Sequence, residues 1–133
     1  MDTQTARDLI QPLLDGFAVE HVHMLFVGAC TEDGFVAGHR NGKRGDLEED
    51  KIAAVSSTLL SLSESAVEQA EEGKLKVLVI EGERSSQVLC RTRLDKLPLV
   101  VFLAMEQNVS IGQTLYLANR LAESISEMSA SGV

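Results

Sequence analysis

Two histidines near the start of the chain are the first residues whose types and spacing could do chemistry. His21 and His23 stand two positions apart, so on a strand they point to the same side. Imidazole is a common zinc ligand, but a zinc site takes three or four protein ligands. No cysteine or carboxylate nearby has the spacing that completes such a set, and we predict no metal site.

A glycine-rich basic segment, residues 38–45 (GHRNGKRG), raises the possibility of phosphate binding. Its glycines are one residue too close for a P-loop, and Arg44 stands where a serine or threonine would hold Mg²⁺. We interpret the segment as a solvated connecting loop, with a contact surface for an acidic partner as the alternative.

The sequence also shows no motif typical of nucleophilic catalysis. The sequence contains no G-x-S-x-G motif, and Cys30 and Cys90 both lie in apolar runs typical of buried, reduced thiols. The carboxylates gather at the ends of predicted helices, where they offset the helix dipole. An enzyme is therefore the least favoured class, and we predict no catalytic residues and no cofactor.

The composition and net charge of the chain disfavour some classes of binding partner. The chain has 133 residues and a net charge of −8, which disfavours nucleic acid and anionic membranes as ligands. Its longest apolar runs fall well short of the roughly 20 residues of a membrane span, and residues 1–10 carry no apolar signal segment. We expect one cytoplasmic domain over residues 1–133, with an ordered core at about 6–128.

The hydropathy pattern predicts the elements that must position any site. A first helix is expected over residues 2–15, ended by Gly16 and kinked or divided at Pro12. The turn signal at 32–34 (EDG) predicts a hairpin. Asp46 and Glu49 have capping-box spacing at the start of a long helix ending near Glu72, and Ser110 and Gln113 repeat that spacing before a last helix. The expected strands cover residues 21–30, 35–39, 75–81, 87–93 and 99–105.

These elements specify a fold class. Strands 21–30 and 99–105 are apolar on both alternating faces, so each must be covered on both sides. Short connections make the last three strands antiparallel neighbours. We therefore predict an α/β protein, a three-layer α/β/α sandwich around a five-stranded antiparallel sheet in the order α-β-β-α-β-β-β-α. The long helix should cover one face and the terminal helices the other.

The long helix is the most informative element. Residues 52–63 (IAAVSSTLLSLS) contain no charge, although charged residues make up 24% of the chain. One interpretation is that a wide apolar arc covers the chain's own sheet. The other is that one flank of the arc covers the sheet while the other flank meets the same helix of a second copy around a two-fold axis. Strand 75–80 would then pair with its counterpart as an edge. The residues expected in this dimer interface are Ile52, Val55, Ser56, Leu59, Leu62, Ser63, Ala66, Leu75, Val77 and Val79.

Several local features together resemble the roadblock/dynein-light-chain family over residues 8–128. They are the strand-turn-strand at 22–37, the acidic start and Leu/Ala/Ser-rich body of the long helix, residues 77–82 (VLVIEG), and Asn108 leading into Gly112. The resemblance implies a profilin-like topology. It also implies a homodimer built through the long helices and strand 75–80.

Bacterial and archaeal members of that family often bind Ras-like small GTPases on the dimer surface without being enzymes themselves. By position, the resemblance assigns partner binding to Thr58, Ser61, Ser65 and Glu68, with Arg40 and Arg44 in the flanking loop. An arginine finger is chemically possible, but a flexible glycine-rich loop would hold it poorly. The leading hypothesis is therefore a homodimeric regulator that modulates GTP hydrolysis or localisation. A scaffold subunit without GTPase contact and a ligand-sensing domain remain alternatives.

Overall fold

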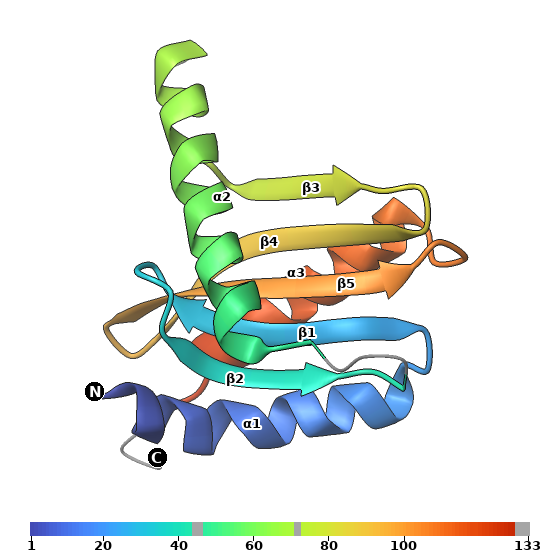
Figure 1. The fold of residues 1–133 in the computed structure, drawn as a ribbon. Coiled ribbons are helices and arrows are strands. Elements are labelled where there is room, and N and C mark those ends of the chain that lie inside the picture. Colours follow the sequence, from blue (N-terminus) through green and yellow to red (C-terminus); the bar gives the residue numbers. More distant parts are fainter. Residues whose placement is uncertain (44–46, 71–72, 130–133) are drawn as a thin grey trace.

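The computed structural model describes residues 1–43, 47–70 and 73–129 and has the predicted three layers (Figure 1). Helices α1 (Thr3–Glu20) and α3 (Ile111–Ser126) cover one face of the sheet, and α2 (Glu49–Ala70) covers the other. The predicted fold class and element order are confirmed. None of the described helices is both long enough and apolar enough to cross a membrane.

The sheet is antiparallel throughout, with strand order β2-β1-β5-β4-β3. Its middle strand is β5, in which residues 99–105 are all buried, as expected for a run that is apolar on both faces. Strands β2 and β3 form the two edges. The strand bounds are Met24–Thr31 for β1, Val36–Asn41 for β2, Val77–Glu81 for β3, Ser85–Leu94 for β4 and Leu97–Glu106 for β5.

Two separate apolar cores lie on the two faces of the sheet. The larger core packs α1 and α3 against the sheet and includes Ile10, Leu14 and Leu121. The smaller core lies under α2. Its buried members are Cys30, Ala53, Leu60, Leu89, Val100 and Phe102. The position of α2 therefore depends on relatively few side chains.

The predicted end of the first helix is wrong. Helix α1 continues through Pro12 and Gly16 to Glu20, and the proline does not divide it. Phe17 is buried one turn beyond Leu14 on the same face, so core packing holds the last turn in the helix. Pro12 and Gly16 lie on the exposed side, where neither disturbs that packing.

The predicted placement of the two histidines on one strand face is also wrong, because β1 begins only at Met24. His21 caps α1 through an N–H bond of 3.0 Å to the Phe17 carbonyl, and its ring lies 4.1 Å from the Phe17 ring. His23 Nδ1 lies 3.1 Å from a carboxylate oxygen of Glu106. Both histidines thus have structural partners.

Other predicted boundaries shift by a few residues. Arg40 and Asn41 belong to β2 and not to the connecting loop. The expected cap at Asp46 and the expected helix end at Glu72 lie outside the described residues. The second cap is confirmed, because Ser110 Oγ accepts a 3.1 Å bond from the Gln113 N–H.

The burial of Cys30 and Cys90 leads to a chemical prediction. Burial raises the pKa of the Cys30 thiol to about 12, with a contribution from Asp33, and that of Cys90 to about 11. We expect neither thiol of the native protein to react with iodoacetamide at mildly alkaline pH, and both to react after unfolding in guanidinium, as measured by mass spectrometry. Because unfolded thiols ionise at lower pH, stability should fall as pH rises from about 9 towards these values. Rapid alkylation of the native protein would contradict this prediction.

Candidate functional site

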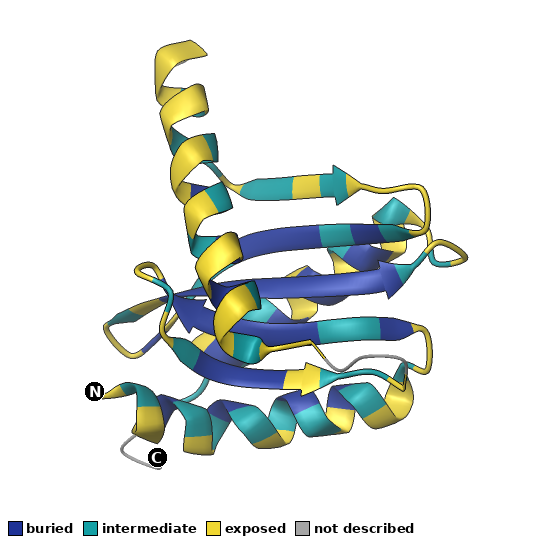
Figure 2. Cartoon of the chain, viewed as in Figure 1, coloured by how far each residue is buried: buried dark blue, intermediate teal, exposed yellow. Residues whose placement is uncertain are grey.

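Helix α2 runs across the strands, and its last turns project past the β3 edge (Figure 1). Its buried residues are Ala53, Ser56 and Leu60, all within the first 12 of its 22 residues. The projecting turns are mostly exposed (Figure 2). A few helical turns without tertiary support are marginally stable in water. The described part of the protomer therefore gives the end of α2 little packing surface.

The outward side of α2 carries an uncharged surface, which we call the α2 surface: Val55, Thr58, Ser61, Leu62, Ser65 and Ala66, all exposed. Leu62 is 64% exposed and Val55 is 52% exposed. The Thr58 hydroxyl donates a 2.9 Å bond to the Ala54 carbonyl, so it is satisfied within the helix. Exposed apolar side chains grouped with neutral hydroxyls make the α2 surface a candidate contact surface.

The ten residues predicted for the dimer interface separate into three sets. Val55, Leu62, Ala66 and Val79 are exposed, whereas Ile52, Leu59, Ser63, Leu75 and Val77 are partly buried. Ser56 is buried against the chain's own sheet. Val77 packs towards the α1 and α3 side, and Ile52, Leu59 and Leu75 pack towards the α2 side. One flank of the apolar arc thus covers the sheet, and the exposed flank remains the predicted contact.

Strand β3 adds an unpaired sheet edge beside this surface. It bonds to β4 along one side, from Val77 opposite Cys90 to Glu81 opposite Ser86. Along its other side, the described part of the chain places no strand. A free row of N–H and C=O groups invites pairing with another strand.

The residues assigned to partner binding by the family resemblance do not form one group. Thr58, Ser61, Ser65 and Glu68 are exposed along one stripe of α2. Arg40 lies instead on the α1 side of the sheet, where it forms an ion pair of 3.1 Å with Asp15. Arg44 lies outside the described residues.

An ionic cluster that no sequence motif predicted holds α2 where it leaves the sheet. Arg91 of β4 contacts the Glu64 carboxylate of α2 and lies 4.0 Å from Glu32 in the β1–β2 turn. Its Nε is buried and has no hydrogen-bond partner among the residues that the structure describes. The three residues come from distant parts of the chain, so no local spacing reveals them.

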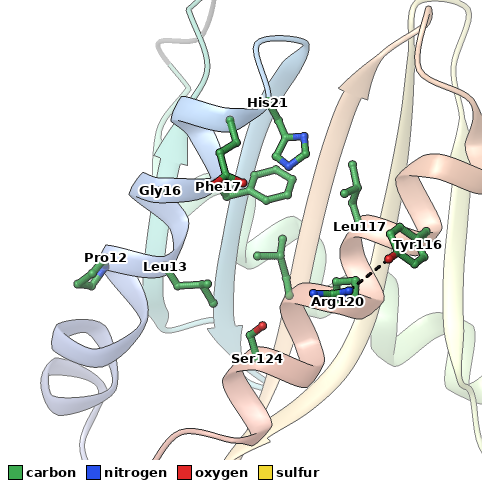
Figure 3. A pocket seen from close by; sticks show the side chains of 11 residues that line it. Pro12, Leu13, Gly16, Phe17, His21, Tyr116, Leu117, Arg120 and Ser124 are labelled. Carbon is green, nitrogen blue, oxygen red and sulfur yellow. Dashed lines mark hydrogen bonds between the residues drawn. The ribbon is translucent and has the colours of Figure 1, made fainter.

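The other face of the molecule has a groove between α1 and α3 with a volume of about 500 Å³ (Figure 3). Its apolar lining includes Leu13, Phe17 and Leu121, and the Arg120 guanidinium donates a 3.2 Å bond to the Tyr116 hydroxyl at its rim. Among residues 1–43, 47–70 and 73–129, no group of three or more His, Cys, Asp or Glu side chains is placed to hold a metal ion.

The comparison with protein families agrees with this architecture. The Roadblock/LC7 domain model matches residues 17–101, which is more than half of the chain. The chain belongs to the Roadblock/LC7 family. A comparison with curated proteins gives no match.

Solved structures share the fold of this Roadblock/LC7 protein at low sequence identity. One described as MglB with tetrameric arrangement is 13% identical, with a TM-score of 0.77 over 96% of this chain and 93% of that chain. A Roadblock/LC7 domain from Streptomyces avermitilis is 18% identical, with a TM-score of 0.71 over 86% and 92%. Profilin II from Acanthamoeba castellanii is 11% identical, with a TM-score of 0.57 over 88% and 96%. The predicted profilin-like topology is therefore confirmed.

Proposed function

We propose that this Roadblock/LC7 protein is a cytoplasmic, homodimeric, non-enzymatic regulator of a Ras-like small GTPase. The observation that carries the proposal is the α2 surface, uncharged and exposed beside the open β3 edge. The structural neighbour described as MglB with tetrameric arrangement supports self-association of this fold. The two free, buried thiols fit a reducing compartment.

In the proposed dimer, the two β3 strands pair and the two α2 helices pack together around a two-fold axis. This arrangement gives the projecting turns of α2 the packing that one protomer lacks. It also buries Val55 and Leu62, and full burial of such side chains contributes about 1.5–3 kcal/mol each. Pairing of two β3 strands removes both open edges at once.

The paired helices would offer the GTPase a surface of hydroxyls with a carboxylate at its end. On each helix this surface consists of Thr58, Ser61, Ser65 and Glu68. No arginine lies on α2, and Arg40 lies on the other side of the sheet. We therefore propose that the regulator acts by ordering catalytic groups of the GTPase and does not insert an arginine finger.

The test is a binding and GTP-hydrolysis assay with a small GTPase encoded near this protein, loaded with GDP or with a GTP analogue. Replacing Ser61 and Ser65 by arginine should weaken binding at least about tenfold, a loss of about 1.4 kcal/mol. Asn119→Arg, an exposed change on α3, is the matched control and should leave binding unchanged. Absence of binding in both nucleotide states would contradict the GTPase proposal.

A scaffold subunit is the second candidate, and the α1–α3 groove favours it because the groove provides a contact surface on the face away from α2. A dimer that binds no GTPase but joins a larger assembly through Tyr116 and Arg120 would support this candidate. Alanine at both positions separates the two functions, since it leaves the α2 surface intact.

A further inference from the structure

The two edges of the sheet differ in how they are covered. The β3 edge is open, whereas polar side chains of α1 reach over the β2 edge. These side chains are Arg7, Gln11 and Asp15, spaced four residues apart on one stripe of the helix. We call them the α1 seam.

Gln11 occupies the backbone groups of β2 that a neighbouring strand would use. Its amide Nε2 donates a 2.7 Å bond to the His39 carbonyl, and its Oε1 accepts a 3.0 Å bond from the His39 N–H. In an antiparallel ladder, one residue of a partner strand exchanges this same pair of bonds. The Gln11 amide therefore replaces one residue of a sixth strand.

The other members of the seam hold α1 beside the edge. Arg7 makes two bonds of 2.9 Å to the Glu49 carboxylate at the start of α2. Because α1 and α2 lie on opposite faces of the sheet, this ion pair joins the two outer layers at the β2 edge (Figure 1). Asp15 accepts from Gln11 at 3.0 Å and pairs with Arg40, the residue after His39.

We infer that the α1 seam closes the β2 edge to strand addition, so that a second copy of this chain can add only at β3. With both edges open, β3 of one copy could pair with β2 of the next, and such head-to-tail contacts extend without closing. With one edge closed, pairing through β3 stops at two chains. The inference rests on the strand-pairing part of the proposed function.

The test compares the full-length wild-type protein with an Arg7→Ala/Gln11→Ala variant by sedimentation velocity at increasing concentration. Gln4→Ala is the matched control for Gln11→Ala, because Gln4 is on the same helix and its side chain donates to the exposed Asp8 carboxylate. The wild type and the control should stop at the dimer. The double variant should form larger species whose share grows with concentration, and in dilute solution its His39 amide should exchange with deuterium faster.

A double variant that stays folded by circular dichroism and stops at the dimer would overturn the inference. If the double variant unfolds, Gln11→Ala alone decides in the same way, since it keeps the Arg7–Glu49 ion pair. A monomeric wild type would contradict the proposed dimer but not the seam. In that case, if the double variant associates while the wild type does not, the result would still support closure of the β2 edge by the α1 seam. A double variant that is folded and monomeric would overturn the inference.

Discussion

Replacing Val55 and Leu62 together by glutamate is expected to convert the proposed dimer into folded monomers. Both side chains are exposed in the protomer, so the changes leave its cores intact. In a two-fold dimer, the two glutamates of each chain together add four carboxylates to the interface. The six residues of the α2 surface include no cation that could pair with them. The loss of apolar burial and the cost of burying unpaired charge should weaken dimerisation at least about a hundredfold, or about 2.7 kcal/mol.

The measurement is sedimentation equilibrium across a dilution series, with circular dichroism to confirm folding. A Val19→Glu/Val22→Glu variant is the matched control. These two residues are also exposed, but they lie at and just beyond the end of α1, away from the α2 surface. The control should dimerise like the wild type. A Val55→Glu/Leu62→Glu variant that dimerises equally well would place the interface elsewhere.

Replacing Phe102 by alanine is expected to reduce the free energy of unfolding by about 3–5 kcal/mol. Phe102 lies on the central strand in the small core under α2, and its ring centroid is 6.1 Å from that of Phe26. A Cβ built at Gly28 would stand 2.4 Å from a Phe102 ring atom, so the ring lies directly on that glycine. Truncation would leave a cavity that its well-packed neighbours cannot fill.

Urea denaturation followed by circular dichroism measures this loss. Phe35→Ala is the matched control, because Phe35 is exposed in the β1–β2 connection and its truncation should change stability by less than about 0.5 kcal/mol. Since Phe102 supports the few side chains that position α2, the variant should also dimerise more weakly. A loss of stability no larger than that of the control would contradict the assignment of Phe102 to this core.

The sequence predicted the fold because its strongest signals are periodic. The run at 99–105, apolar on both faces, required cover on both sides, and the structure places it in the middle strand. The end of α1 was missed because the burial of Phe17, a tertiary contact, outweighs the local helix-ending tendency of Gly16.

The sequence predicted the α2 surface in part and did not predict the α1 seam. The uncharged run at 52–63 in an acidic chain indicated the α2 surface, but the sequence could not tell which residues the sheet would bury. Ser56 is covered by the chain's own core, whereas Leu62 is not. The α1 seam escaped prediction because Gln11 bonds to backbone atoms of a residue 28 positions away, which leaves no pattern of side-chain types.

The proposed dimer is tested most directly by sedimentation equilibrium of the wild-type protein in dilute solution, combined with hydrogen exchange of the last turns of α2. For the proposed dimer we expect particles of twice the chain mass and protected amides between Ser61 and Ala70. Particles of one chain mass, with those amides exchanging as fast as an unsupported helix, would contradict it.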